Sequence, residues 1–458
     1  MIQRFSPARQ TRLARSVSAV ALSSALCWLG GVAPALAQEV TQGARQPAPV
    51  LAPPADLGGS QMDLFSKDTV SVLIDARLVV ANGATSFVNG GFGKTRFQGD
   101  ADGHYKASLA PVEADLVWVP RFTSSLSANV SVAYQKDHEE SVDLIEAFVN
   151  YLPARTGPVG VSARAGLMWP EISLEHSTGG AWSVVNTITP SAINAWVGEE
   201  VKVLGGEGTL HASVGQSELA ATVGVFGYND TSGTLLSFRG WALHDEKATA
   251  DGYFKLPPLN PFIVHLQEDR TKNTTDLDNK AGFYGRLDWR PPQPFGVSVF
   301  YYDNRGDPEA FTAAGQWGWR TRFWNVGFNA DLGPNTKLLA QGMTGSTIMG
   351  FEDNGERWVH TKFQSAYVLV TQMVGDVAVT GRVEAFSTGE HGSEMPANNS
   401  EDGWALTAAA RVPINDRLTA LFEAMNVRSS RDTRVTLGGL SSPFEAQTVL
   451  QASLRLRL

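Results

Sequence analysis

The chain has 458 residues, of which 43% are hydrophobic, and its 46 acidic and 37 basic residues give a formal charge of −9 at pH 7. This acidic balance argues against a nucleic-acid partner, because binding to phosphate backbones depends on basic residues. The single cysteine, Cys27, lies in the N-terminal leader. The rest of the chain contains no cysteine, which excludes disulfide bonds and thiol catalysis there.

The N-terminal segment has the features of a secretory signal. Its positive residues are Arg4, Arg9, Arg12 and Arg15. An uncharged stretch follows over 17–37 and ends in small residues, as signal peptides do before their cleavage site. About 20 uncharged residues could also span a membrane as a helix. The small-residue end favours cleavage before Gln38. We therefore predict a signal peptide over 1–37 and a flexible, Pro/Ala-rich periplasmic tail over 38–67.

From residue 68 onward, apolar and polar side chains alternate with period two, which predicts strands with one apolar and one polar face. The last fourteen residues, 445–458, are the clearest case, because leucines alternate there with Gln451, Ser453, Arg455 and Arg457. The same alternation begins near residues 69, 281, 376, 404 and 416. A strand that separates oil from water in this way is typical of the wall of a membrane barrel.

Short turns and long loops alternate between these strands. Tight turns are predicted at 120–124, 153–158, 205–208, 257–261, 291–294, 333–335, 375–376 and 415–416. Longer loops are predicted near 82–109, 170–196, 271–280, 303–315, 345–360, 388–402 and 429–444. The region 209–255 leaves the strand count open by one hairpin. The pattern predicts an all-β fold over 68–458, a transmembrane antiparallel β-barrel of about 16 to 18 strands with short periplasmic turns and long extracellular loops.

Charged residues on the polar faces should point into the barrel, because Arg or Lys facing lipid at mid-depth costs about 2–4 kcal/mol. The predicted inward cations are Arg77, Arg164, Arg286, Arg320, Arg322, Lys337, Arg382, Arg411, Arg455 and Arg457. The predicted inward acids are Asp75, Glu113, Asp115, Glu146, Asp288, Glu384 and Glu423. The excess of arginine favours a water-filled pore that attracts anions. The alternative is that each arginine pairs with a carboxylate on the wall.

The segment 170–196 is too long for a simple hairpin tip and contains Glu171, Glu175, His176 and Trp182. Long loops with apolar residues of their own are usually functional. We predict a constriction loop folded into the lumen, with a surface cap as the open alternative. No second close ligand pair occurs among the eight histidines, so we predict no metal site.

A resemblance to a known family rests on the run 142–175. A strand over 144–151 contains Glu146-Ala147-Phe148, and the next strand carries Arg164-Ala165-Gly166 before Pro170. This run resembles Gram-negative porins of the phosphate-selective type. The resemblance implies trimeric, roughly 16-stranded channels for small, often anionic solutes. It also implies that Arg164 and the loop after it lie in or near the pore.

The sequence therefore predicts a porin in the bacterial outer membrane, through which small hydrophilic solutes diffuse passively, with anionic ones favoured. We predict no enzymatic activity and no cofactor. The alternatives are an exporter of an acidic polysaccharide and, less favoured, an outer-membrane barrel enzyme, although no Ser/His/Asp cluster stands out. The expected partners are outer-membrane lipid and lipopolysaccharide, the barrel assembly machinery and the solutes. A homotrimer and a monomer both fit the pattern.

Overall fold

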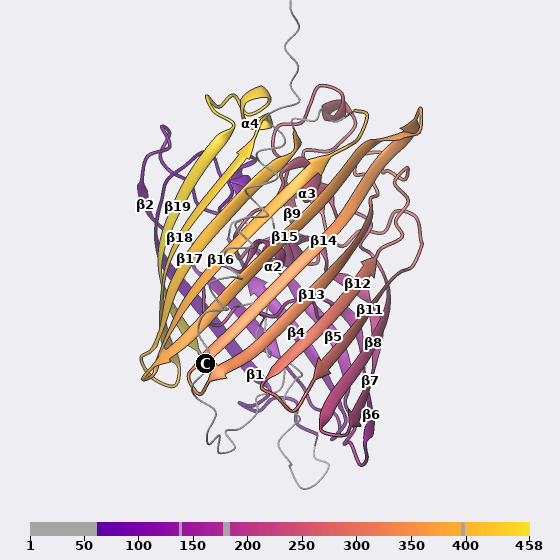
Figure 1. Cartoon of the computed structure of the whole chain (residues 1–458), viewed down its shortest axis with the longest axis vertical. Coiled ribbons are helices and arrows are strands. Elements are labelled where there is room, and N and C mark those ends of the chain that lie inside the picture. Colours follow the sequence, from indigo (N-terminus) through magenta and orange to yellow (C-terminus); the bar gives the residue numbers. More distant parts are fainter. Residues whose placement is uncertain (1–61, 137–139, 177–183, 395–398) are drawn as a thin grey trace, which may run out of the picture. The chain divides into compact units, whose positions relative to one another are not determined.

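The computed structural model describes residues 62–136, 140–176, 184–394 and 399–458. These residues form a closed antiparallel barrel of 16 strands with one extra strand (Figure 1). The fold class predicted from the alternation is thus confirmed. No helix in these ranges is long and apolar enough to cross a membrane.

The barrel strands follow one another around the wall in chain order. They are β1 Val70–Ala81, β3 Glu113–Trp118, β4 Leu126–Tyr134, β5 Val142–Tyr151, β6 Val159–Met168, β7 Val203–Val214, β8 Ser217–Gly227, β11 Gly282–Arg290, β12 Phe295–Asp303, β13 Arg320–Gly333, β14 Thr336–Asp353, β15 Glu356–Val374, β16 Val377–Glu390, β17 Glu401–Pro413, β18 Leu418–Arg431 and β19 Phe444–Arg457. The extra strand β2 (Lys106–Leu109) pairs with the end of β1.

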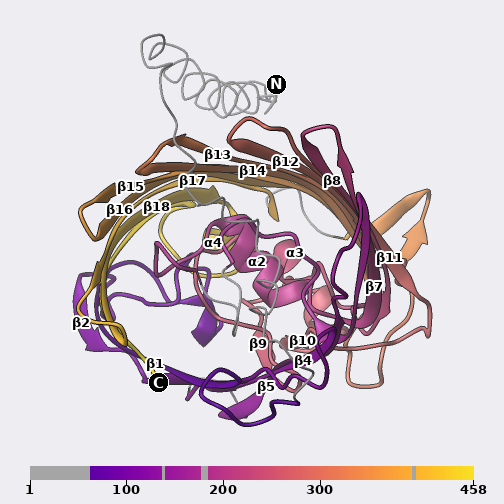
Figure 2. The same ribbon diagram turned by 90° about the horizontal axis from the view of Figure 1, so that it is seen from below.

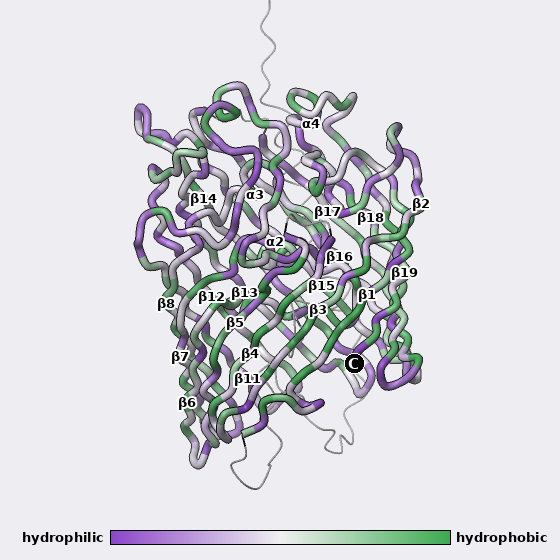
Figure 3. The backbone as a smooth tube through the Cα atoms, turned by 180° about the vertical axis from the view of Figure 1, so that it is seen from behind, coloured by the Kyte–Doolittle hydropathy of each residue, from purple (hydrophilic) through white to green (hydrophobic). Residues whose placement is uncertain are grey.

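The first and last strands close the barrel. β1 pairs with β19 from Leu73 opposite Arg457 to Ala81 opposite Val449, and it also pairs with β3. Every barrel strand in the described ranges therefore has a paired neighbour on both edges. A membrane interior requires this pairing, because it offers no water to the backbone N–H and C=O groups. Figure 3 shows hydrophobic residues along the strands and many hydrophilic residues in the loops at one end of the barrel.

Short turns lie at one end of the barrel and long loops at the other. The turns at 120–124, 153–158, 291–294, 333–335, 375–376 and 415–416 join neighbouring strands near the predicted positions. We call the two ends the short-turn end and the long-loop end.

Three predicted connections are wrong. Gly205 and Gly208 lie inside β7, whose hairpin with β8 turns at 215–216 instead. A Cβ on Gly205 would lie 2.4 Å from the Val225 carbonyl oxygen, so the glycine permits close contact between strands and does not mark a turn. The prolines of 257–261 lie within one long loop, 228–281. The predicted loop 345–360 is mostly strand, since β14 and β15 are joined only by residues 354–355.

Several long-loop segments fold into the barrel. The helices α2 (Ala192–Glu200) and α3 (Thr234–Phe238) lie inside the ring of strands, and every residue of both is buried (Figure 2). The loop 228–281 also contains a short helix, η2 (Ile263–His265), and the paired strands β9 (Tyr253–Lys255) and β10 (Arg270–Lys272). The remaining short helices are η1 (Phe87–Asn89) and α4 (Thr433–Thr436).

The infolded segments form an apolar core with inward side chains of the wall. The ring centroid of Trp196 lies 5.3 Å from that of Phe323, 5.2 Å from that of Phe363 and 6.0 Å from that of Trp241. The alternation predicted a uniformly polar inner face, and this prediction is wrong for part of the wall. Part of it is a packed interior like that of a globular domain.

Candidate functional site: the lumen and its infolded loop

The lumen loop, residues 169–202, connects β6 to β7 and is held against the opposite wall. Arg382 of β16 forms ion pairs with Glu175 of the loop at 3.0 Å and with its wall neighbour Glu384 at 2.8 Å. Its guanidinium also donates hydrogen bonds to the carbonyls of Thr189 and Pro190. The described residues of this segment, 170–176 and 184–196, therefore lie against inward side chains of the wall.

Wall carboxylates accept hydrogen bonds from the backbone of the lumen loop. Glu423 of β18 accepts from the N–H of Ile188 at 2.7 Å and from that of Thr189 at 3.0 Å. Glu384 accepts from the N–H of Ala192 at 2.7 Å. Ala192 is the first residue of α2, whose free N–H groups and positive dipole end favour a carboxylate there.

The start of α2 is determined locally by Ser191. The Ser191 hydroxyl accepts from the N–H of Asn194, an N-cap contact that satisfies one of the free donors of the first turn. Glu175 accepts hydrogen bonds from the Ser191 hydroxyl and from the Asn194 amide. The described part of the loop thus contains its own polar framework.

The other end of α2 contacts the loop 228–281 through two adjacent carboxylates. Glu199 pairs with Arg239 at 2.6 Å; burial raises its pKa, but Arg239 and His244 lower it more, to about 2. Glu200 accepts from the N–H of Leu235 and the indole of Trp196, and its burial raises its pKa to about 7. Neighbouring acids therefore hold different protonation states at the α2–α3 contact.

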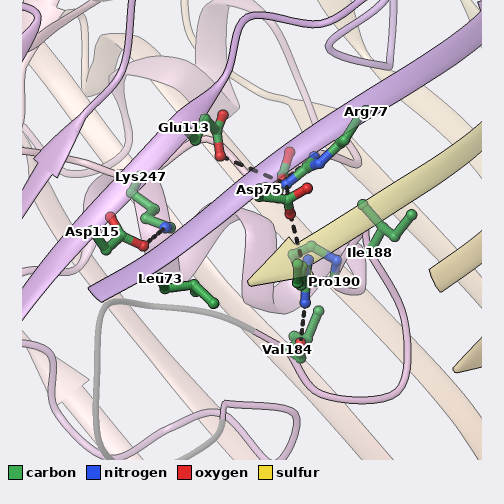
Figure 4. A pocket seen from close by; sticks show the side chains of 11 residues that line it. Leu73, Asp75, Arg77, Glu113, Asp115, Val184, Ile188, Pro190 and Lys247 are labelled. Atoms are coloured by element: carbon green, nitrogen blue, oxygen red, sulfur yellow. Dashed lines mark hydrogen bonds and ion pairs between the residues drawn. The ribbon is translucent and has the colours of Figure 1, made fainter. Parts of the chain in front are cut away.

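A charged pocket lies between the lumen loop and the wall strands β1, β3 and β19 (Figure 4). Its charged lining residues are Asp75, Arg77, Glu113, Asp115, Asp245, Lys247 and Arg455, with Val184, Ile188 and Pro190 on the side of the lumen loop. Arg77 pairs with Asp245 at 2.5 Å, and Asp75 pairs with Arg455 at 2.8 Å. The pocket therefore presents both signs of charge.

The pocket's loop residues are ionised at neutral pH. Burial raises the pKa of Asp245, but Arg77 and Arg96 lower it well below its usual range. Lys247 pairs with Asp115 at 3.1 Å, and this carboxylate raises the pKa of the ammonium despite burial. The pocket therefore contains fixed charges of both signs.

A second charged group lies on the wall formed by β6, β7 and β11. Arg164 pairs with Glu207 at 2.7 Å, and Arg286 pairs with Asp288 at 2.7 Å. Arg286 also donates to the Glu171 carbonyl, and Tyr284 donates to Glu207. The predicted residues Arg164, Arg286 and Glu171 thus meet at the point where the lumen loop leaves the wall.

The remaining predicted residues are placed as follows. Arg411 is half-buried on the inner face of β17 near the short-turn end, and Trp182 lies outside the described residues. His176 is half-buried; this burial, with Lys247 and Arg164, lowers its pKa to about 4.

Arg320 and Arg322 lie on the opposite face from that predicted. They share the outer face of β13 with the exposed Trp324, whereas Thr321 and Phe323 point inward. Thr321 donates to the Ser232 carbonyl in the infolded loop, and Phe323 packs on Trp196. The apolar lumen core occupies the inner face here, so the arginines face outward.

The prediction missed the charged residues that the long loops bring into the lumen. Lys94 pairs with Glu401 at 2.5 Å, and Arg239, Asp245 and Lys247 take part in the contacts described above. A signal was present, because 239–247 combines five charged or histidine residues with Trp241 and Leu243. Surface loops seldom need such an apolar content.

Two groups of three side chains among the described residues are close enough to hold a metal ion. One is Asp100, Asp102 and His104, which is exposed, and the other is Asp230, Asp276 and Asp278. Both lie in loops at the long-loop end. Exposed clusters such as the first are common without an ion, whereas Asp230 of the second is buried.

No protein-family model and no curated protein matches the chain. Among solved structures, the outer membrane channel DcaP of Acinetobacter baumannii is similar over 87% of this chain and 100% of its own, with 9% identity and a TM-score of 0.50. OmpT, an outer membrane protein of Vibrio cholerae, is similar over 86% of this chain and 99% of its own, with 8% identity and a TM-score of 0.44. Salmonella typhi OmpF, solved in complex with daunomycin, is similar over 86% of this chain and 100% of its own, with 12% identity and a TM-score of 0.43. The likeness to DcaP shows that the two chains share a barrel fold.

Proposed function

We propose that the protein is an outer-membrane porin that allows passive diffusion of small hydrophilic solutes, with anions favoured. The observation that carries the proposal is the lumen loop, held by Arg382, Glu384 and Glu423 inside a closed barrel. A tethered loop narrows a channel without sealing it permanently, and a pocket lined by charged residues lies beside it.

The preference for anions is supported by cations near the short-turn end. Arg290, Arg411 and Arg457 lie on the inner face of their strands and form no ion pair with a carboxylate in the described ranges. Fixed cations raise the local concentration of anions and lower the barrier to their passage. Phosphate selectivity requires more than this set of residues, so the proposal covers small anions as a class.

The proposal includes a route to the membrane. Residues 1–37 act as a cleaved signal peptide, and residues 38–67 form a periplasmic tail. The barrel assembly machinery inserts the barrel, which then contacts outer-membrane lipid and lipopolysaccharide. The assembled channel is a homotrimer, an arrangement that the flat apolar outer face permits.

The test is conductance and reversal potential of the refolded protein in a planar bilayer under a salt gradient. We expect stable ohmic steps with an anion-selective reversal potential. Arg290→Glu with Arg411→Glu should shift the reversal potential towards cations. The control is Lys67→Glu with Arg417→Glu, the same change in charge at two exposed residues.

Two outcomes would contradict the proposal in different ways. A folded barrel, verified by its heat-dependent mobility on a gel, that passes no small ions would overturn the channel and favour a closed exporter of an acidic polysaccharide. Conductance with cation preference, unchanged in the double variant, would overturn only the anion assignment.

A further inference from the structure

The outer face of β13, β14 and β15 carries a row of polar residues in direct register. Arg322 is opposite Ser346 in β14, and Ser346 is opposite Lys362 in β15. Adjacent strands lie about 4.8 Å apart, so the two cations are roughly 10 Å apart at their backbones. Long side chains from these positions can converge on one anionic group above Ser346. We call Arg322, Ser346 and Lys362 the outer cationic row; Arg320, which is opposite Ile348, lies beside it.

The rows beneath it place the outer cationic row at a membrane interface. The next register row towards the short-turn end is Trp324, Thr344 and Gln364, and the row after that is Val326, Gly342 and Ala366. Trp324 and Val326 are 54% and 49% exposed, as lipid-facing residues would be. Tryptophan prefers the headgroup level, and the wall below it is apolar.

The charges of this row are incompletely neutralised. Arg320 pairs with Asp303 at 3.2 Å. Arg322 has its Nε 3.5 Å from the Ser346 hydroxyl, and neither Arg322 nor Lys362 forms an ion pair with a carboxylate among the described residues. Both side chains are exposed. A cation facing lipid costs little at the headgroup level, about 0–1 kcal/mol, and gains there from an anionic lipid.

We propose that the outer cationic row binds a phosphate group of a phosphorylated glycolipid in the outer leaflet. An arginine fork, an ammonium and a hydroxyl suit the oxygens of a phosphate monoester. The apolar wall immediately below, with Val326 and Ala366, lies where the acyl chains of that lipid would run. This inference rests on the outer-membrane location proposed above.

The experiment uses the full refolded chain in detergent with EDTA present, which removes binding through bridging divalent cations. Binding of bisphosphorylated lipid A is measured by native mass spectrometry. Dephosphorylated lipid A and an excess of inorganic phosphate serve as comparison ligands. The variant is Arg322→Glu with Lys362→Glu. The control is Lys67→Glu with Arg417→Glu, which makes the same charge change at exposed positions of the short-turn end.

We expect the variant to bind lipid A about 30-fold more weakly, from about 1 kcal/mol per cation lost at a membrane surface, and the control to bind it normally. Wild-type protein should bind the dephosphorylated lipid as weakly as the variant binds lipid A. Equal affinities of variant and wild type, or equal binding of both lipids, would overturn the inference. Efficient displacement by inorganic phosphate would assign the row to a free anion and overturn the lipid part.

Conductance of the same preparations separates this inference from the proposed function. The outer cationic row is outside the lumen, so the variant should conduct like wild type. A protein that binds lipid A through these residues but never conducts would refute the channel and leave the lipid site standing.

Discussion

Arg382 is the side chain on which the position of the lumen loop depends most. It is 3% exposed and contacts Glu175, Glu384 and the carbonyls of Thr189 and Pro190. A buried cation is stabilised only when such partners surround it. Its removal leaves Glu175 and Glu384 as close, uncompensated acids inside the barrel.

Replacement of Arg382 by Gln should therefore release the lumen loop. Loss of one partner from a buried ion pair costs about 3–5 kcal/mol, which acts on the loop and not on the hydrogen-bonded wall. We expect larger single-channel conductance and new protease cleavage within 184–202. Arg417→Gln, at an exposed turn, is the control. Wild-type conductance and protease resistance in Arg382→Gln would show that other contacts hold the loop.

Glu200 should make the α2–α3 contact depend on pH. Its pKa is raised by burial from 4.5 to about 7, so the folded loop holds a proton that the released loop loses. The stabilisation of the α2–α3 contact by this proton is complete below pH 4.5 and is lost as the pH rises through 7. Hydrogen exchange of α2, corrected for intrinsic rates, should accelerate over this range. Glu200→Gln should remove the difference, and an unchanged pH profile in that variant would exclude Glu200 as its source.

Sequence alternation placed some lumen residues and misplaced others for one physical reason. Arg382 could be assigned inward because Val379 and Val383 mark the lipid face of β16. The face of Arg322 could not be assigned in this way. Its neighbour Phe323 points inward although it is apolar, because it packs on Trp196. Alternation identifies the lipid face only where the inner face of the wall contacts water. It is ambiguous wherever a distant segment covers the inner wall.

At the scale of elements, α3 lies against the wall through a glycine. Gly233 precedes the helix with φ 108°, and a Cβ there would lie 2.1 Å from the Thr347 hydroxyl and 2.7 Å from that of Thr321. Only glycine fits this approach and adopts this conformation readily. The contact fixes the infolded loop 228–281 against β13 and β14.

The substitution Gly233→Val should displace α3 while the barrel persists. Overpacking of this kind costs about 1–3 kcal/mol, and the positive φ adds strain. We expect the fluorescence of the buried Trp196 and Trp241 to change at lower urea than in wild type, with unaltered heat-dependent gel mobility. Gly381→Val is the matched control, because nothing lies within 4 Å of a Cβ on that residue. Equal urea midpoints for both variants would contradict the close approach.

The elements themselves were predictable to different degrees. Turns with Pro, Asn or Asp between amphipathic strands could be located, as at 291–294 and 415–416. The hairpin of β7 and β8 could not, because its only turn glycine is Gly215 and Gly205 gave a stronger but misleading signal. The helices α2 and α3 depend on partners from the wall that no local pattern reveals.

For the whole molecule, the pairing of β1 with β19 determines whether a barrel exists. β19 pairs along its length with β18 and β1, and the Leu458 N–H donates to the Val72 carbonyl. A chain without β19 would leave two unpaired edges in lipid, where each unsatisfied backbone group costs several kcal/mol.

Deletion of residues 449–458 should therefore abolish the folded barrel. No heat-modifiable band should appear on refolding into detergent. Deletion of Leu458 alone removes only its two backbone hydrogen bonds with Val72 and should permit the band. A stable, heat-modifiable barrel from the longer deletion would show that β1 and β18 can close without their shared neighbour.

The long sequence separations within the lumen impose an order of assembly. Arg382 meets Glu175 across 207 residues, and Ala192 meets Glu384 across 192. The lumen loop consequently has no native surroundings until the second half of the wall is in place, and contacts of such separation form slowly. While the barrel assembles, we expect the loop to remain hydrated inside a partial cylinder. We therefore expect the wall to form first and the contacts of the lumen loop last, which implies that each molecule passes through a stage as an open tube.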